Sequence, residues 1–510
     1  MLLLLEIVVV AWCLGRPVRL LAQPGFRRKL EAFPHVRTLI LVGAASAAAV
    51  LAAAAIWWRP GFHLAAALAV GALTWDAIRA RPGFGRRRGL PPGALRFAPL
   101  DPWRDQEFFR QQALAHGPVF KFCHVHRPTI CLLGLSLGHE LLRLHADKLK
   151  TLPLPFSRHV PNGFLRYMGA EERQRYRGVL ASSLSREVAQ ANVPAIAEHI
   201  GEALPSVVAE RADAGGRSDL GARLHAMTGN VLQRILFGPL EADERAGLWR
   251  ALDSTDFRRA ARRSGGRIRR GLEDAEVILR TRVAQMGSEP ATRPTSALEA
   301  LAASQPQMAA DRTVLLNLFY MWQTASADVA GMLHWCIACL GASPHWRERL
   351  QEACQGDGVP PLARAIVQET LRMEQSEYLM REVQREFRHA GFRFPAGYLV
   401  RVCVRESHRL DPAVADADTF NPGRFLDGGL PRRHFSPFGT GATACPGEHL
   451  ALLIGSIFLT ELSRRYRWEA TASGAPEFGG FHWRPGPGCR LRATVCGSLD
   501  AVPGRGRRSA

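Results

Sequence analysis

Two neighbouring apolar segments stand near the start of the chain. Residues 38–58 carry no charged side chain, and residues 61–78 are apolar apart from His63 and Asp76. At 1.5 Å per residue, the first segment is long enough to cross a hydrocarbon core about 30 Å thick. The pattern predicts a transmembrane helix in the first segment and an anchor over residues 38–80. The second segment either completes a helical hairpin or lies in the membrane interface after a single crossing.

Basic residues stand on both sides of this anchor. They are Arg27, Arg28, Lys29 and Arg37 in the apolar and basic N-terminal segment 1–37, and Arg79, Arg81, Arg86, Arg87 and Arg88 after the anchor. Under the positive-inside rule, a hairpin with this flanking charge keeps both ends, and the rest of the chain, on the cytoplasmic side. Residues 81–94 are interpreted as a basic, Pro-rich linker, because Pro91-Pro92 cannot continue a helix.

The remaining chain shows long helical patterns and few strand patterns. Short β-rich runs within residues 121–134, interrupted at Arg127-Pro128, predict a hairpin. Helices are expected over residues 136–147, 170–184, 192–211, 220–236, 241–251, 271–285, 311–340 and 361–373. We therefore predict a mainly α domain with small β-sheets over residues 95–497, preceded by the N-terminal transmembrane helices. A basic flexible tail is expected over 498–510.

The charge balance points to an anionic surface as partner. Of the 510 residues 47% are hydrophobic, as in a packed globular protein, and the formal net charge is +20. This charge suits nucleic acid or phospholipid headgroups. The basic run from Arg258 to Arg270 has only Phe257 as a neighbouring aromatic, so membrane lipid is favoured and no nucleic-acid partner is expected. The ten cysteines are scattered, which excludes a disulfide-dense module and a zinc ribbon.

One cysteine stands apart from the others. Cys445 lies in the glycine-rich segment 438–447, immediately before a helical pattern over 448–464. Glycines at 439, 441 and 447 let backbone approach a flat ligand, and a helix start stabilises a thiolate. Such a position suits an axial sulfur ligand of haem iron, whose electron donation favours cleavage of an O–O bond.

The order Phe438, Gly441, Cys445, Gly447 resembles the haem-binding signature of the cytochrome P450 family, F-x-x-G-x-x-x-C-x-G. Glu369 and Arg372 resemble the family's E-x-x-R helix motif, and their spacing places both charges on one helical face. Arg424 falls in a segment similar to the family's P-x-R-F loop. The resemblance covers residues 90–497 and implies the cytochrome P450 fold, haem b bound through Cys445, and an ion network of Glu369, Arg372 and Arg424.

Other family positions follow from this resemblance. Arg173, Arg177 and Arg381 resemble residues that bind the haem propionates, although surface salt bridges are an alternative for each. Thr443 stands where most members have a basic residue. This resembles the branch that contains sterol 7α-hydroxylases and prostacyclin synthase.

The expected distal helix departs from the family pattern. Most members place an acid followed by threonine there to relay protons, whereas this chain has Ala327-Asp328. Thr324 and Ser326 are close in sequence, and Asp328 could hold a water or deliver a proton. Alternatively, these residues only pack the helix.

The resemblance leaves three functions open. The first, which we favour, is a membrane-anchored monooxygenase that hydroxylates a lipophilic, sterol-like or fatty-acid-like substrate with electrons from NADPH or NADH through a reductase or ferredoxin. The second is an isomerase or dehydratase acting on a lipid peroxide without external electrons. The third is a non-catalytic membrane haem-binding protein. Family position suggests Phe156, Phe164 and Met380 as pocket residues.

Overall fold

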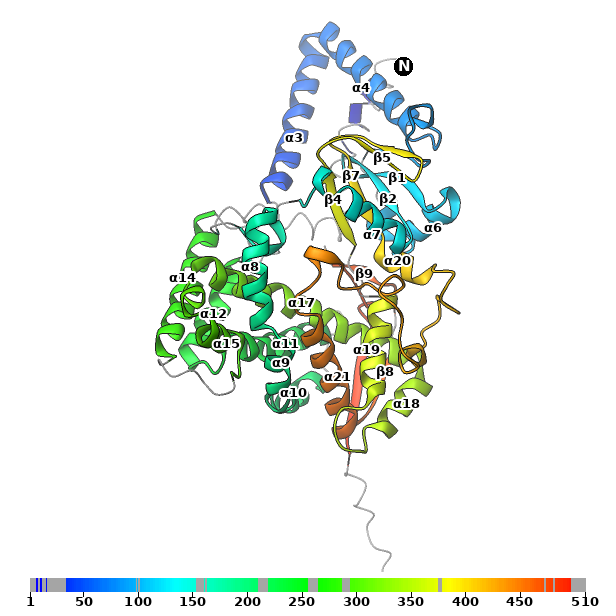
Figure 1. Cartoon of the computed structure of the whole chain (residues 1–510). Helices are drawn as coiled ribbons and strands as arrows, with labels where there is room; N and C mark the ends of the chain where they lie inside the picture. Colours follow the sequence, from blue (N-terminus) through cyan, green and yellow to red (C-terminus); the bar gives the residue numbers. More distant parts are fainter. Residues whose placement is uncertain are drawn as a thin grey trace, which may run out of the picture.

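The computed structural model describes residues 6–7, 10–11, 15, 34–97, 99, 101–152, 160, 163–209, 219–255, 265–286, 294–374, 378–471, 474–479 and 482–496. Within these ranges helices dominate and the strands form small sheets (Figure 1). The predicted fold class, mainly α with small β-sheets, is confirmed. Phe156, four of the arginines between 258 and 270, and the tail 498–510 lie outside the described residues.

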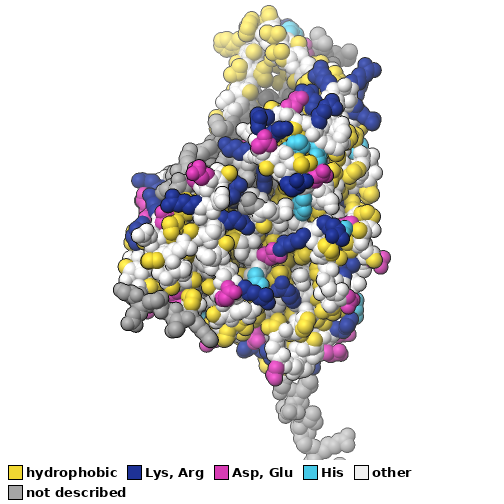
Figure 2. All heavy atoms as spheres, in the orientation of Figure 1, with side chains coloured by type: hydrophobic (Ala, Val, Ile, Leu, Met, Phe, Trp, Pro, Cys, Tyr) yellow, Lys and Arg dark blue, Asp and Glu magenta, His cyan; other side chains and the backbone are white. Residues whose placement is uncertain are grey.

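The N-terminal apolar segments form two helices, α3 (Pro34–Trp57) and α4 (Arg59–Arg79), joined at Trp58. They fold back on each other and project from one end of the molecule (Figure 1). Helix α4 is long and apolar enough to span a membrane, and α3 contributes the shorter apolar stretch Val42–Ala54. Hydrophobic side chains cover this projection, and Lys and Arg side chains gather beside its base (Figure 2). The two helices are candidates for membrane anchoring.

The linker after the hairpin is docked on the domain rather than extended away from it. The buried Lys121 ammonium donates to the carbonyl oxygens of Pro91 (2.6 Å) and Pro82 (3.3 Å). Gly93 has a φ of +110°, and a Cβ there would come within 2.2 Å of the Lys121 carbonyl oxygen. Only glycine fits this close approach, so the linker is fixed against the domain.

The largest sheet has the strand order β1-β2-β7-β4-β3. Strands β1 (Val119–His124) and β2 (Arg127–Leu132) form the expected hairpin, but its turn lies at Val125 and His126, because Arg127 and Pro128 already pair within β2. Strand β7 (Leu399–Val402) runs parallel to β2, whereas β4 (Leu379–Val383) and β3 (Leu149–Lys150) are antiparallel additions. The smaller sheets pair β5 (Phe387–His389) with β6 (Phe392–Phe394), β8 (Tyr466–Thr471) with β11 (Arg490–Val495), and β9 (Glu477–Phe478) with β10 (Trp483–Arg484).

The helices that the sequence predicts are present with bounds shifted by a few residues. They are α7 (Leu135–Leu144), α8 (Ala170–Ser183), α10 (Val193–Val208), α11 (Leu220–Phe237), α12 (Ala242–Thr255), α14 (Gly265–Gln285), α17 (Arg312–Ala342), α19 (Pro361–Met373) and α21 (Glu448–Arg465). Shorter helices were not predicted. They are α5 (Asp101–Arg104), α6 (Phe108–His116), α9 (Arg186–Ala191), α15 (Ala297–Ser304), α16 (Pro306–Ala309), α18 (Pro344–Ala353) and α20 (Val404–Arg409).

The long helix α17 forms the centre of the core. On one side the buried Trp322 donates its indole N–H to the Gly229 carbonyl oxygen of α11 (2.8 Å). Farther along, Gly455 of α21 lies so close to Met332 that a Cβ there would come within 2.8 Å of the methionine side chain. Because α17 is packed between α11 and α21, its remaining faces are fixed relative to the Cys445 loop, which directly precedes α21.

Candidate functional site

The segment around Cys445 is held by its own backbone. The amide of Cys445 donates to the Phe438 carbonyl oxygen (2.8 Å), and the amide of Ala444 donates to that of Gly441 (3.1 Å). Gly439 and Gly441 have φ values of +73° and +62°, which side chains rarely adopt. Among the cysteines that the structure describes, Cys445 alone is exposed, whereas the others are buried or half-buried. The loop therefore presents one thiol away from the core.

Two of the expected arginines touch this loop. Arg177 of α8 donates to the Ala444 carbonyl oxygen (3.0 Å), and Arg381 of β4 donates to the Thr443 hydroxyl (3.2 Å). Thr443 stands where most members of the family have a basic residue, and the Arg381 guanidinium of β4 lies beside it instead. The sequence did not predict this contact, because β4 is remote from the loop along the chain.

The third arginine has different partners. Arg173 donates to the carbonyl oxygens of Met168 (2.6 Å) and Leu165 (3.4 Å), in the turn that precedes α8. Burial and the nearby Arg177 cation lower the pKa of Arg173. Arg173 therefore braces the start of its own helix, whereas Arg177 and Arg381 reach the Cys445 loop.

The three residues of the expected ion network meet in the interior. Arg372 binds Glu369 through two hydrogen bonds, from Nε to Oε2 (2.7 Å) and from Nη2 to Oε1 (2.8 Å), and both side chains are fully buried. Arg424 adds a hydrogen bond from its Nε to Glu369 Oε1 (3.1 Å). The remaining Arg372 donors reach backbone carbonyl oxygens of His408, Ala417 and Thr419. A buried guanidinium is tolerated only when its donors are paired in this way.

Helix α17 presents two different faces near the expected distal segment. Ser326 is fully buried, donates to the Trp322 carbonyl oxygen (2.6 Å), and accepts at its own carbonyl oxygen from Thr228 of α11 (2.9 Å). The structure thus places Ser326 against α11 rather than beside Thr324 and Asp328. Four residues after Trp322, Ser326 shares the face that packs against α11.

Thr324 and Asp328 share the opposite face, because they are also four residues apart. The Thr324 hydroxyl donates to the Tyr320 carbonyl oxygen (3.0 Å). The Asp328 side chain is 57% exposed, and its Oδ1 lies 3.6 Å from Nε2 of His482, in the turn between β9 and β10. No sequence motif indicated His482. The turn that carries His482 packs on α17, where Trp335 donates to the Trp483 carbonyl oxygen (3.0 Å), and this packing brings His482 close to Asp328.

Two suggested pocket residues are described. Phe164 is buried and stacks on Tyr320 of α17, with ring centroids 4.1 Å apart. Its segment is tied to the same helix, since the Leu165 amide donates to the Asn317 side chain (2.7 Å). Met380 is half-buried in β4, beside Arg381.

The residues around Cys445 fit a haem. At Gly441 a Cβ would meet no atom within 4 Å, so the backbone there borders open space. The exposed thiol can supply the axial sulfur, and Arg177 and Arg381 place cations beside the same loop, where propionate groups would need them.

Comparisons with known proteins agree with this geometry. The sequence profile of the cytochrome P450 family matches residues 329–480. The rice protein "Cytochrome P450 714B2" is 32% identical over 28% of this chain and 32% of its own length. The tomato protein "Abscisic acid 8'-hydroxylase CYP707A1" is 34% identical over 22% of this chain and 24% of its own length. The matching stretch thus spans a third or less of these two relatives.

The fold extends over more of the chain than the sequence match. The retinoic-acid-bound cyanobacterial CYP120A1 superposes with a TM-score of 0.65 at 19% identity, over 80% of this chain and 99% of that one. A zebrafish cytochrome P450 solved with progesterone gives a TM-score of 0.61 at 20% identity.

Both solved neighbours are cytochrome P450 structures, so the domain has the cytochrome P450 fold. The matching profile and the rice relative are those of cytochrome P450s, so residues 329–480 are similar in sequence to that family. The placement of the chain in the sterol 7α-hydroxylase and prostacyclin synthase branch is not shown by these comparisons and stays a prediction.

Proposed function

We propose that the protein is a membrane-anchored haem-thiolate monooxygenase that hydroxylates a lipophilic substrate. The exposed Cys445 thiol carries this proposal, because it lies in a loop that Arg177 and Arg381 both contact. Haem bound there would supply the activation of dioxygen, with one oxygen atom entering a C–H bond and the other leaving as water. The two electrons come from NADPH or NADH through a reductase or ferredoxin.

The protein's own residues then bind, orient and supply protons. Arg177 and Arg381 would hold the propionates, and the turn before α21 would present the Cys445 thiolate. On α17, Asp328 takes a proton at Oδ1 from Nε2 of His482, 3.6 Å away, as a carboxylate and imidazole pair can. This pair supports hydroxylation, which consumes protons, over rearrangement of a peroxide, which does not.

A lipophilic substrate is supported by the apolar hairpin, which would hold the domain at a membrane surface. Named relatives include an abscisic acid 8'-hydroxylase and an abietadienol/abietadienal oxidase. We propose that sterol-like or fatty-acid-like molecules reach the site from the bilayer, on the cytoplasmic side.

The test is spectroscopic and then chemical. The reduced full-length protein under carbon monoxide is expected to absorb near about 450 nm, as a thiolate-ligated haem does. Cys445→Ser is expected to abolish this band, whereas the control Cys496→Ser, a half-buried thiol after β11, leaves it intact. A wild-type protein without bound haem, or an unchanged band in Cys445→Ser, would overturn the proposal.

Turnover separates the remaining functions. Consumption of NADPH that depends on substrate and reductase supports hydroxylation. Turnover of a lipid hydroperoxide without reductant would instead establish the isomerase alternative, and a normal band with neither activity would establish a binding role.

A further inference from the structure

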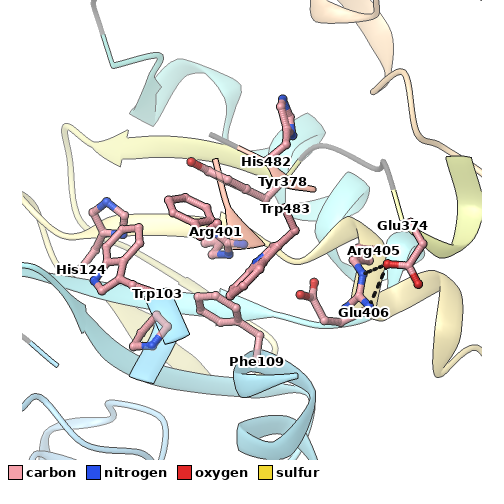
Figure 3. Close-up of a pocket in the computed structure, with 12 residues that line it drawn as sticks. Trp103, Phe109, His124, Glu374, Tyr378, Arg401, Arg405, Glu406, His482 and Trp483 are labelled. Carbon is pink, nitrogen blue, oxygen red and sulfur yellow. Dashed lines mark hydrogen bonds and ion pairs between the residues drawn. The ribbon is translucent and has the colours of Figure 1, made fainter. Parts of the chain in front are cut away.

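A pocket lies between the large sheet and the C-terminal turn. Its walls come from β7, α20, the segment before β1, and the turn that joins β9 to β10. Aromatic side chains form much of this lining, among them Trp103, Phe109, Tyr378 and Trp483 (Figure 3). Charged residues from β7 and α20 complete it, so the pocket combines apolar walls with a polar floor.

Arg401 of β7 is the unusual member of this lining. Its side chain is 8% exposed, and its guanidinium carbon lies 3.7 Å from the ring centroid of Tyr378 and 4.0 Å from that of Phe109. Among the described residues it makes no side-chain hydrogen bond or ion pair, and its Nε is buried without a partner. Cation–π contacts with two rings hold the guanidinium in place but satisfy none of its N–H donors.

The neighbouring charges do not satisfy it either. Arg405 is already bound by Glu107 (3.0 Å) and Glu374 (3.3 Å). Glu406 is 5% exposed and lines the same pocket, yet it forms no ion pair within the described part of the chain. Burial acts to lower the pKa of Arg401, but the nearby Cys403 and Glu406 outweigh it and raise that pKa, so the guanidinium stays charged. A buried cation without an oxygen partner is unfavourable, so an anion that enters the pocket would be stabilised there.

We propose that this pocket binds a carboxylate, with the Arg401 guanidinium as its anchor. A planar guanidinium offers paired N–H donors that match the two oxygens of a carboxylate. The aromatic walls suit the hydrocarbon that follows such a head group. His482 lines the pocket and also approaches Asp328 of α17 at 3.6 Å, so the pocket adjoins the distal face.

The position of the pocket beside the distal face indicates a class of substrate. This step rests on the proposed function. A lipophilic carboxylic acid would place its carboxylate at Arg401 and extend its hydrocarbon past His482 toward the catalytic face. A small separate carboxylate bound beside the substrate would use the same chemistry.

The experiment compares decanoate with decan-1-ol, which differ only in the head group. Binding to the full-length haem-loaded protein in phospholipid nanodiscs is measured by calorimetry and by the haem spin-state shift. Arg401→Gln is expected to weaken decanoate binding at least tenfold and decan-1-ol binding less than twofold. Arg467→Gln, which removes an exposed arginine of β8, is the control for lost net charge and is expected to change neither. Equal effects of Arg401→Gln on both ligands, or none on decanoate, would overturn the proposal.

A second variant covers the case in which Arg401→Gln does not fold. Glu406→Gln removes the carboxylate that repels an anion in the pocket, so decanoate is expected to bind severalfold more tightly and decan-1-ol equally. Unchanged or weaker decanoate binding in Glu406→Gln would then overturn the proposal.

Two further measurements distinguish the source of the carboxylate and the reason for any failure. A decanoate spin-state shift that requires Arg401 indicates that Arg401 binds the substrate's own carboxylate. Binding of propionate that requires Arg401, causes no spin-state shift and does not compete with decan-1-ol indicates that Arg401 binds a separate carboxylate. The carbon monoxide band is recorded for every variant. Its absence from the wild type counts against the proposed function, and its presence with unselective binding counts against the carboxylate site alone.

Discussion

The backbone amide of Ser436 donates a hydrogen bond to Nε2 of His408, at 3.0 Å. His408 also accepts at its carbonyl oxygen from Arg372 (3.0 Å), and the Ser436 hydroxyl donates to the Gly439 carbonyl oxygen (3.1 Å). One buried histidine, through its carbonyl oxygen on one side and its ring on the other, therefore connects the Glu369–Arg372 pair to the loop that presents Cys445. Because its Nε2 must accept, the ring is neutral; burial and the Arg372 cation lower the pKa of His408 to about 3.

This imidazole is expected to make folding stability depend on pH. In the unfolded chain a histidine binds a proton below a pKa of about 6.5, whereas His408 in the folded protein does so only near 3. The contribution of neutral His408 to folding stability is therefore fully present above about pH 6.5 and is lost as the pH falls toward 3. From pH 7 to pH 5 the loss is about 2 kcal/mol for this group. Denaturant unfolding of His408→Gln at both pH values should show a drop smaller by that amount; an equal drop would contradict the assignment.

The buried ion pair predicts unequal effects of two arginine substitutions. Arg372→Ala leaves the Glu369 carboxylate buried without its bidentate partner, so we expect a loss of about 3 to 5 kcal/mol or failure to fold. Arg424→Ala removes one of several donors to the same carboxylate, and we expect a loss of about 1 to 2 kcal/mol. Denaturation midpoints of the two variants test this order. The reverse order would show that Arg424, not Arg372, neutralises Glu369.

The three arginines expected at the haem should separate into two groups. Arg177→Gln and Arg381→Gln remove cations that contact the Cys445 loop, so haem affinity is expected to fall about tenfold in each. Arg173→Gln removes hydrogen bonds to the turn before α8, so it is expected to lower stability by about 1 kcal/mol and to leave haem affinity nearly unchanged. Titration of the apoproteins with haem, alongside thermal unfolding, distinguishes the two effects. Equal haem loss in all three variants would contradict this division.

The Asp328–His482 pair predicts a proton-dependent phenotype. Asp328→Asn and His482→Gln are each expected to reduce product formed per NADPH consumed about tenfold, because proton delivery fails while electron supply continues. Ser326→Ala is the matched control on the same helix, since Ser326 faces α11. Unchanged coupling in Asp328→Asn would show that the residue only packs.

Deletion of residues 1–70 tests the anchor. It removes most of the apolar hairpin but keeps Asp76, whose carboxylate accepts from the Phe97 amide (2.6 Å). The shortened protein is expected to remain folded and to stay at the bottom of a vesicle flotation gradient, whereas the full-length chain floats. Flotation of the shortened protein would place the main membrane contact on the domain itself.

Prediction from the sequence was most successful where residues close together along the chain determine the structure. Helical periodicity located the long helices α8, α11, α17 and α19, and the spacing of Glu369 and Arg372 put both charges on one face of α19. It did not assign Ser326 to a face of α17, because the position of α11 decides that face. It missed His482 and the contact between Arg381 and Thr443, since each joins segments far apart in the chain.

The sequence by itself determined the mainly helical fold class, the apolar N-terminal segments, and the single cysteine in a glycine-rich loop before a helix. These are properties of residue order, periodicity and local backbone freedom, which act over a few positions. Only the tertiary structure decided which arginines reach that loop, which face of α17 carries Asp328, and that Arg401 Nε lies buried without a partner among the described residues. Those outcomes depend on how distant elements pack, and packing fixes the partner of each buried charge.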